Sequence, residues 1–355
     1  MTPDQISDAL KQVHYPGFSR DIVSFGLVKQ IESDASAIRV QIEVQTRDPK
    51  VPEQIFKDCH AALDPLAGGT TVEIEIEVKD APATPSDDPS AGQSSIPGVK
   101  KVIAIASGKG GVGKSTVSAN LAVALAATGA RVGLCDCDLY GPSIAMMFGS
   151  NESPMANEND EIIPIEAHGI QLMSMGFLLE DASPVIVRGP LATRYTQQFL
   201  RQVAWNDLDY LVLDLPPGTG DIQLTIVQTV AVDGVVIVTT PQEVALIDAR
   251  KAASMFAKVN VPILGMIENM AWFECDHGTR YHLFGDGGGR REAERLGVPL
   301  LAQIPIDPET CARADNGNPV ALLPADENDS SAAFHKAADQ LPAALAPSGK
   351  QAPWD

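Results

Sequence analysis

The sequence predicts an α/β protein with a mostly parallel β-sheet covered by helices on both faces, preceded by a small N-terminal α+β domain. Over most of the chain, short continuous apolar runs alternate with helical stretches, which is typical of strands buried on both faces of a parallel sheet. Near the N-terminus, apolar and polar residues instead alternate strictly, as in strands with one solvated face. A segment rich in Pro, Ser and Asp separates the two patterns.

Residues 1–79 are expected to form a helix, two strands, a helix and a strand in that order. The segments AIRVQIEVQT (37–46) and TVEIEIEV (71–78) place their apolar residues on one strand face. VPEQIFKDCHAAL (51–63), between them, has helical apolar spacing. Cys59 lies on that apolar helix face, so we expect it to belong to the core and not to bind a metal.

Residues 80–98 read DAPATPSDDPSAGQSSIPG and are expected to be a semi-extended linker because Pro, Ser, Asp and Gly dominate them. Residues 99–346 then form the second domain, and 347–355 a flexible tail. Ligands of parallel sheets bind beyond the carboxyl ends of the strands. The runs predicted as strands are KVIAIA (101–106), RVGLCD (131–136), IQLMSM (170–175), YLVLDL (210–215), GVVIVTT (234–240), PILGMIEN (262–269) and PLLAQIP (299–305).

The net charge, the cysteine content and the lack of long apolar runs exclude several classes of function and location. The 355 residues include 26 Lys and Arg against 46 Asp and Glu, a formal net charge of −20. Such a chain disfavours nucleic acid and anionic membranes as partners. Five scattered cysteines do not resemble a disulfide framework and favour a reducing compartment. The first residues, MTPDQISDALKQV, lack the features of a signal peptide, and no apolar run approaches the ~20 residues of a membrane helix. We therefore expect a cytoplasmic protein.

The strongest motif is SGKGGVGKST, in which residues 108–115 fit G-x-x-x-x-G-K-[ST] directly after a predicted strand and before a predicted helix. Its glycines let backbone N–H groups approach phosphates closely. Lys114 is expected to reach the β- and γ-phosphates of ATP, Ser115 to ligate Mg²⁺, and Thr116 to donate to the α-phosphate. The predicted nucleotide-binding residues of this P-loop are Gly108, Lys109, Gly110, Gly111, Val112, Gly113, Lys114, Ser115 and Thr116.

Polar residues also follow three other predicted strands. Asp136 and Asp138 end the run RVGLCDCD, and Asp214 ends YLVLDL in the manner of a Walker B acid. Asp138 and Asp214 are expected to hold the Mg²⁺ shell and orient water, and with Lys109 and Lys114 they are the predicted catalytic residues. Asn269 ends GMIEN, where its amide can pair with an adenine edge.

Two smaller expectations concern neighbouring residues. Cys135 and Cys137 flank Asp136 and are expected to face opposite sides of a buried strand, so we do not expect them to share a metal. Asp221 is expected to cap the helix after PPGTG.

These motifs resemble those of a known family. GKGGVGKST is similar to the deviant Walker loop of the ParA/MinD/nitrogenase-iron-protein class, in which the lysine matched here by Lys109 reaches the partner's nucleotide across a dimer. Together with CDCDLYGPS, MGF, RGP, DYLVLDLPPGTGD, TTPQEVALIDARK and GMIENMAWFEC, it resembles the Mrp/ApbC family of iron–sulfur cluster carrier proteins. The N-terminal RDIVSFGLV (20–28) resembles the small cluster-assembly domain often fused to that family, although YPG (15–17) replaces its acidic pair.

The resemblance implies a homodimeric ATPase that binds a [4Fe–4S] cluster between its protomers and passes it to apo-proteins, alongside cluster-assembly factors. A ParA/MinD-type regulatory or positioning ATPase that has lost cluster binding is the alternative.

The sequence departs from the family at the cluster site. Cys275 is followed by Asp276 and His277, and the second cysteine of the family's C-x-x-C pair is missing. Three interpretations stay open. Cys275 of each chain ligates the cluster together with His277 or another group, or Cys275 acts with an external thiol or a partner protein's ligands, or the site is lost and the chain is an ATPase with an altered role. His282 is expected to be a surface or packing residue, and Cys311 a structural one.

Overall fold

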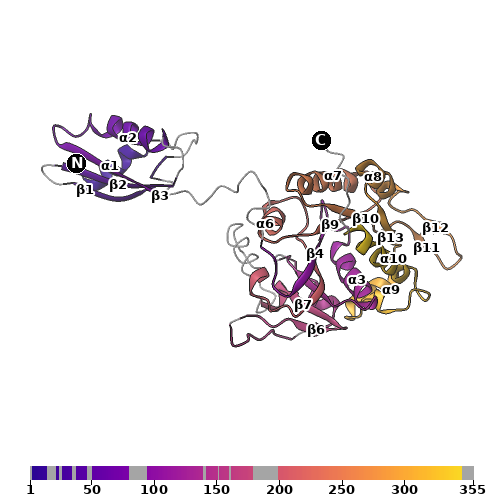
Figure 1. The fold of residues 1–355 in the computed structure, drawn as a ribbon. Coiled ribbons are helices and arrows are strands. Elements are labelled where there is room, and N and C mark those ends of the chain that lie inside the picture. The colour runs from indigo at the N-terminus through magenta and orange to yellow at the C-terminus, as the bar shows by residue number, and fades with distance from the viewer. Residues whose placement is uncertain are drawn as a thin grey trace. The chain divides into compact units, whose positions relative to one another are not determined.

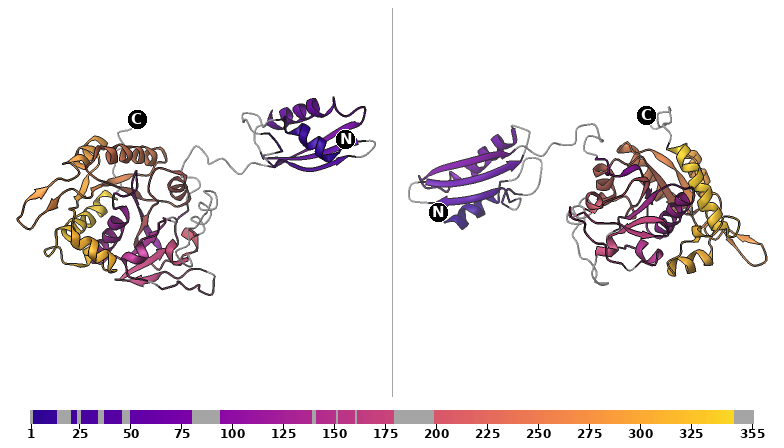
Figure 2. Two further views of the ribbon diagram at one scale, coloured as in Figure 1. Left: turned by 180° about the vertical axis from the view of Figure 1, so that it is seen from behind. Right: turned by 60° about the horizontal axis from the view of Figure 1, so that its bottom comes forward.

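The computed structural model describes residues 2–13, 21–23, 26–33, 37–45, 50–79, 94–138, 141–150, 152–159, 161–178 and 199–345. The chain divides into two compact units, Met1–Asp87 and Asp88–Asp355 (Figures 1 and 2). The expected linker lies outside the described residues as far as residue 93, and the expected tail 347–355 lies wholly outside them. Ser94 forms a β-bridge with Val230, and Ile96 is buried, so the last residues of the expected linker pack on the second unit.

The N-terminal unit has the element order that the sequence predicts. Its elements are α1 (Pro3–Leu10), β1 (Val28–Ser33), β2 (Ala37–Gln45), α2 (Lys50–Leu63) and β3 (Thr71–Lys79). The sheet order is β1-β2-β3, with β1 antiparallel and β3 parallel to β2. Apolar residues of α1, α2 and β2 form one core cluster, so both helices cover the same sheet face. Cys59 is fully buried in that cluster, as expected.

The second unit is built on an eight-stranded sheet with the order β13-β10-β9-β4-β8-β5-β7-β6. Every neighbouring pair is parallel except β6 with β7. The strands are β4 (Val99–Ala106), β5 (Val132–Asp136), β6 (Ile165–Ala167), β7 (Ile170–Ser174), β8 (Leu208–Asp214), β9 (Gly234–Thr239), β10 (Ile263–Glu268) and β13 (Leu300–Gln303). Each apolar run predicted as a strand therefore overlaps one.

Helices cover both faces of this sheet, which confirms the predicted fold class. On β4, Ile103 and Ile105 join a core cluster with α3 and α10, whereas Val102 and Ala104 join a cluster with α6 and α7 on the opposite face. The helices are α3 (Lys114–Ala127), α4 (Ile144–Met147), α6 (Asp221–Thr229), α7 (Glu243–Lys258), α8 (Gly288–Leu296), α9 (Pro308–Asp315) and α10 (Asp329–Ala344), with short 3₁₀ turns η1 (Met175–Leu178) and η2 (Val320–Leu322).

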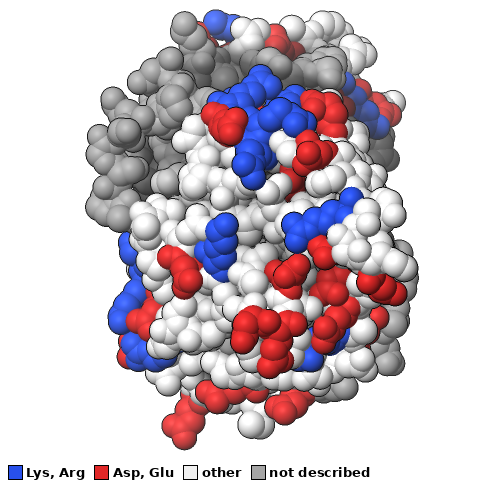
Figure 3. Space-filling model, turned by 90° about the vertical axis from the view of Figure 1, so that its right-hand side faces the viewer, with Lys and Arg blue, Asp and Glu red and all other residues white. Residues whose placement is uncertain are grey.

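A two-stranded hairpin of β11 (Phe273–Glu274) and β12 (Arg280–Tyr281) extends from the carboxyl end of β10 (Figure 1). Hydrogen bonds from Ala271 N to Ile304 O and from Ile306 N to Trp272 O tie its base to the segment after β13. On the face of the molecule seen in Figure 3, acidic and basic side chains are interspersed among uncharged ones. None of the described helices has the length and apolar character needed to cross a bilayer.

Candidate functional site

The P-loop connects β4 to α3, as its sequence predicts, and two of its glycines have left-handed backbones. Gly111 and Gly113 both have φ of +80°, which disfavours residues with a side chain. Gly108 lies so close to α7 that a Cβ atom there would stand 2.1 Å from the carbonyl of Asp248. The loop therefore needs these glycines for its conformation and for its packing, which leaves its backbone N–H groups available at the start of α3.

Three residues of the predicted site meet at the end of β8. Lys114 Nζ donates to Asp214 Oδ1 at 2.6 Å, and Ser115 Oγ donates to Asp214 Oδ2 at 2.6 Å. Lys114 is 6% exposed and Asp214 is fully buried. The structure thus brings together the lysine, the hydroxyl and the Walker B acid that the sequence assigns to phosphate and Mg²⁺.

Ser118 is a member of this cluster that the motif does not include. Its hydroxyl lies 2.6 Å from Asp214 Oδ1 and 3.0 Å from the carbonyl oxygen of Lys114. Residues four apart on a helix share a face, so the spacing of Lys114 and Ser118 is the signal that could have identified it.

Asp136 lies beside Asp214 in the register of β5 and β8 and is also fully buried. Its carboxylate accepts hydrogen bonds from the N–H groups of Asp138, Ser143 and Ile144 at 3.1–3.2 Å. Burial, and next the charge of Asp214, outweigh these donors and raise the pKa of Asp136 to about 7. Asp136 therefore belongs to a buried acidic pair behind the P-loop.

The other two predicted catalytic residues, Asp138 and Lys109, are more accessible. Asp138 lies just beyond β5, and its Oδ1 accepts from the N–H of Gly141 at 3.2 Å. The backbone carbonyl of Lys109 accepts from Ser107 Oγ at 2.9 Å. Lys109 is half-buried, and within the part of the chain that the structure describes its ammonium takes part in no ion pair.

The turn after β8 is attached to the P-loop through its backbone. Gly218 N donates to Ser107 O at 3.0 Å, and the Gln223 side chain donates to Pro216 O. The expected cap of α6 is wrong by one residue: Gly220 is the N-cap, and Asp221 is the first helical residue. A backbone hydrogen bond thus joins this turn directly to the residue that precedes the P-loop glycines.

Asn269 lies against the P-loop and is 7% exposed. Its Nδ2 donates to Val112 O at 2.9 Å, and a Cβ atom on Gly113 would stand 2.2 Å from that nitrogen. The strand pattern alone suggested a role toward adenine. The structure adds a contact that holds the loop from behind.

The expected separation of Cys135 and Cys137 is wrong. Side chains two residues apart on an extended chain lie on the same face, so Cys135 in β5 and Cys137 just after its end turn to the same side and share one core cluster. Both thiols are fully buried, and their Sγ atoms lie 3.9 Å apart. Burial raises the pKa of the Cys135 thiol well above its usual value, which keeps it in the neutral form.

Cys275 lies at the start of the turn that joins β11 to β12. Hydrogen bonds from the backbone N–H groups of His277 and Thr279 lower the pKa of its thiol. The turn depends on Gly278, which has a φ of +72°. Cys275 is partly exposed, and its lowered pKa makes it form the thiolate, which binds metals and acts as a nucleophile, more readily than an ordinary cysteine does.

The two nearby histidines differ from each other. The His277 side chain is exposed, and only the backbone N–H of this residue donates a hydrogen bond to Cys275. The His282 ring lies 3.2 Å from Ala271 O and 3.5 Å from Asp286, which fits the packing role expected for it. Among the residues that the structure describes, no three His, Cys, Asp or Glu side chains gather as a metal site. Cys311, expected to be structural, is exposed on α9.

Two family models match this chain, one over each of its two units. The model of the NUBPL iron-transfer P-loop NTPase family matches residues 98–342. The chain belongs to this family. Residues 3–76 of this NUBPL-family chain also match the model of the iron–sulfur cluster assembly protein family. The predicted resemblances, of the second unit to iron–sulfur cluster carriers and of the N-terminal unit to a cluster-assembly domain, are thus confirmed.

Relatives of this NUBPL-family chain carry the name iron-sulfur cluster carrier protein. The one from Deinococcus radiodurans is 46% identical over 321 residues, covering 90% of this chain and 89% of the relative. The one from Escherichia coli K12 is 42% identical over 305 residues, covering 85% and 81%.

Solved structures are similar to the second unit. A nucleotide-binding protein from Archaeoglobus fulgidus, in complex with ADP, is 38% identical with a TM-score of 0.58 and covers 68% of this chain and 95% of its own. The septum site-determining protein MinD from Pyrococcus horikoshii, complexed with Mg-ADP, is 25% identical with a TM-score of 0.53, at the same coverage.

Proposed function

We propose that this chain is an ATP-hydrolysing iron–sulfur cluster carrier that works as a homodimer and passes its cluster to apo-proteins. The observation that carries the proposal is the meeting of Lys114, Ser115 and Asp214 at the P-loop of a chain that displays an accessible, acidified Cys275 thiol. The names of the relatives, iron-sulfur cluster carrier protein, support the same cargo.

ATP would bind with its phosphates in the P-loop. The Lys114 ammonium would turn from Asp214 toward the β- and γ-phosphates, and the N–H groups of residues 110–116 would surround the remaining oxygens. Thr116 would serve the α-phosphate. Asn269 would hold Val112 in place and border the adenine.

The donor set fits Mg²⁺, because the Ser115 hydroxyl and the Asp214 carboxylate are oxygen ligands whose nearest atoms lie 2.6 Å apart. When bound, Mg²⁺ would neutralise charge on the phosphates. Asp138 would accept a hydrogen bond from the attacking water. Water then adds to the γ-phosphorus as its bond to the bridging oxygen breaks, giving ADP and phosphate. Lys109 would stabilise the same charge on the partner protomer's nucleotide.

The iron–sulfur cluster would be cargo held by the Cys275 thiolates of both protomers. A [4Fe–4S] cluster takes four thiolates in its usual ligation, so two positions remain for His277 or for thiols from outside the chain. Incomplete ligation by the carrier suits a cluster that has to be given away. ATP hydrolysis would loosen the dimer through the turn at Gly218, whose backbone contacts the P-loop.

Anaerobic reconstitution with iron and sulfide tests the cargo. We expect the wild type to bind iron and sulfide, Cys275→Ala to lose them, and Cys311→Ala, which removes another accessible thiol, to bind as the wild type does. Loss of half the loading in His277→Ala would assign that side chain as a ligand. Equal loading in the wild type and in Cys275→Ala, or none in either, would reject the cluster site and favour a regulatory or positioning ATPase.

A further inference from the structure

The N-terminal unit ends in an open strand edge. Among the described residues, β3 pairs with β2 along its nine residues, from Ala37 opposite Thr71 to Gln45 opposite Lys79, and with no strand on its other side. Backbone N–H and C=O groups on such an edge are available to another strand. The open edge is nine residues long, as long as the neighbouring strand β2, so it could pair with a full-length added strand.

Apolar surface lies next to this edge. In β2, Ile38, Val40 and Ile42 are each 1% exposed. Their register neighbours in β3 are only half-buried, and Val78 at the end of the strand is 51% exposed. Because β2 and β3 have the same alternating sequence pattern, the difference arises from position. The helices cover the central strand fully and the edge strand incompletely.

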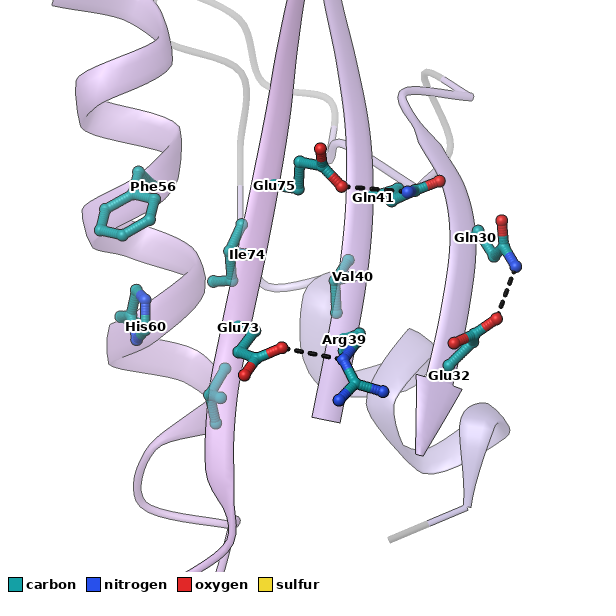
Figure 4. Close-up of a pocket in the computed structure, with 11 residues that line it drawn as sticks. Gln30, Glu32, Arg39, Val40, Gln41, Phe56, His60, Glu73, Ile74 and Glu75 are labelled. Atoms are coloured by element: carbon teal, nitrogen blue, oxygen red, sulfur yellow. Dashed lines mark hydrogen bonds and ion pairs between the residues drawn. The ribbon is translucent and has the colours of Figure 1, made fainter. Parts of the chain in front are cut away.

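Helix α2 supplies the wall of a cavity at this edge. Phe56 is 43% exposed, and its ring lies 4.6 Å from that of His60. Both line a cavity of about 390 Å³ together with Val72 and Ile74 of β3, and polar side chains of all three strands, among them Gln30 and Arg39, line the same cavity (Figure 4). Figure 4 shows both rings beside β3, on the side away from β2. An added strand would therefore find apolar contacts on the helix side.

The opposite side of the edge is acidic. Glu73, Glu75 and Glu77 alternate with the apolar residues of β3, and all three are exposed. Arg39 pairs with Glu73 at 2.8 Å, while Gln41 bonds to Glu75 at 3.0 Å and brings no charge (Figure 4). A second copy of β3 would place these glutamates close to one another, which disfavours self-association.

We propose that the open edge of β3 binds an extended segment of a partner protein in which basic residues alternate with apolar ones. The segment adds a fourth strand by main-chain hydrogen bonds. Its basic side chains lie over Glu75 and Glu77, and its apolar side chains lie against Phe56 and Val78. This site is independent of the ATP and cluster chemistry proposed for the second unit.

The probe is a fluorescein-labelled nine-residue peptide of alternating Lys and Val, titrated into the full-length chain at physiological ionic strength. We expect saturable binding that Glu75→Lys/Glu77→Lys weakens at least about tenfold, the effect of losing about 1.4 kcal/mol. Asp8→Lys/Glu294→Lys makes the same change in net charge elsewhere and should alter affinity less than about twofold. Amides of β3 should become protected from hydrogen exchange on binding.

A peptide N-methylated at every backbone nitrogen keeps the charge but cannot donate to β3, and it should not bind. Binding of this peptide, or equal losses in the two charge-reversal variants, would reduce the interaction to general electrostatics and overturn the proposal. The proposal would also be overturned if the wild type formed a dimer and the Glu75→Lys/Glu77→Lys variant did not. If that variant does not fold by circular dichroism, Phe56→Ser, at an exposed position, replaces it with the same expected loss.

Discussion

Lys114 Nζ lies 2.6 Å from Asp214 Oδ1, and both groups are buried. Asp214 is the register neighbour of Asp136, whose carboxylate is also fully buried. The lysine that is expected to attract phosphate therefore also offsets the charge of acids in the protein core. We therefore expect Lys114 to contribute both to catalysis and to stability, so that a single substitution of Lys114 affects both.

Lys114→Ala should abolish ATP hydrolysis and also destabilise the fold. Removing one partner of a buried ion pair costs about 3–5 kcal/mol, because the other charge remains buried without compensation. Urea denaturation measures the stability loss, and phosphate release measures the activity. Full ATPase activity in Lys114→Ala would overturn the phosphate site.

The double variant Lys114→Ala/Asp214→Asn separates the two effects. It removes the uncompensated carboxylate, so it should recover most of the lost stability while hydrolysis stays absent. If stability does not recover, the loss in Lys114→Ala comes from packing of the lysine stem and not from charge.

Asp136 should make the chain less stable as pH rises. Its pKa is raised from 3.8 to about 7, so the folded chain holds a proton that the unfolded chain has released between these values. Its contribution is fully present below pH 4 and is lost as pH rises to about 7, at up to about 1.4 kcal/mol per pH unit.

The test compares unfolding free energies of the wild type and Asp136→Asn from pH 4 to pH 8. The wild type should lose stability relative to the variant over this range. Asp209→Asn is the matched control, since Lys100 and Arg131 lower the pKa of Asp209 and its contribution is lost only on acidification. A difference independent of pH in Asp136→Asn would show that the buried carboxyl is ionised throughout.

The sequence predicted the fold because the period of its apolar residues reports burial directly. The continuous runs became strands of the large sheet, and the alternating segments 37–46 and 71–78 became strands with one solvated face. Strand order was not predictable, since parallel strands with similar apolar sequences can pair in many orders. The strands β6, β11 and β12 were missed, because strands of two or three residues are too short to show a period.

The sequence predicted those residues of the site that belong to a recognisable motif. Lys114 and Asp214 lie 100 residues apart in the sequence and meet in the structure because β4 and β8 are neighbouring strands. Contacts outside the motifs could not be predicted in this way. Ser118 carries no motif of its own, and its contact with Asp214 requires α3 to pack beside β8. The contact between Cys135 and Cys137 was predictable, by contrast, because side chains two residues apart on a strand share a face.

Cys275 should react with iodoacetamide at lower pH in the folded chain than in urea, because its pKa is lowered only when the turn is formed. Mass spectrometry of the alkylated peptides gives the pH profile. Cys59 is the internal reference, since burial raises its pKa to about 12 and the folded chain should leave it unmodified.

Gly278→Ala tests the cause of that shift. A left-handed backbone costs a residue with a side chain about 1–2 kcal/mol, so the turn should open and the Cys275 profile should move toward that in urea. Gly278→Asn tolerates the same backbone better and should retain most of the shift. Unchanged profiles in both variants would place the origin of the reactivity outside the turn.

Asn269→Ala should weaken nucleotide binding about tenfold, the effect of losing one hydrogen bond of about 1–1.5 kcal/mol that holds the P-loop at Val112. Equal losses for ATP and GTP would assign Asn269 to the loop alone, whereas a larger loss for ATP would establish adenine recognition. Gly113→Ala should bind less nucleotide than Asn269→Ala does, because its Cβ atom meets the Asn269 amide at 2.2 Å.

Lys109 should act on the nucleotide of the other protomer. Its backbone carbonyl accepts a hydrogen bond from Ser107, and among the described residues its ammonium takes part in no ion pair. Lys109→Ala alone, and Lys114→Ala/Asp214→Asn alone, should each be inactive. When the two are mixed, a heterodimer has one intact P-loop, in the Lys109→Ala protomer, and it receives Lys109 from the other. Random pairing makes half the dimers mixed with one working site each, so activity should return to about a quarter of the wild type.

ATPase assays across mixing ratios, with sedimentation to follow the dimer, give the result. No recovery in mixtures that form dimers would place Lys109 in its own protomer's site and remove the basis for an ATP-bridged dimer.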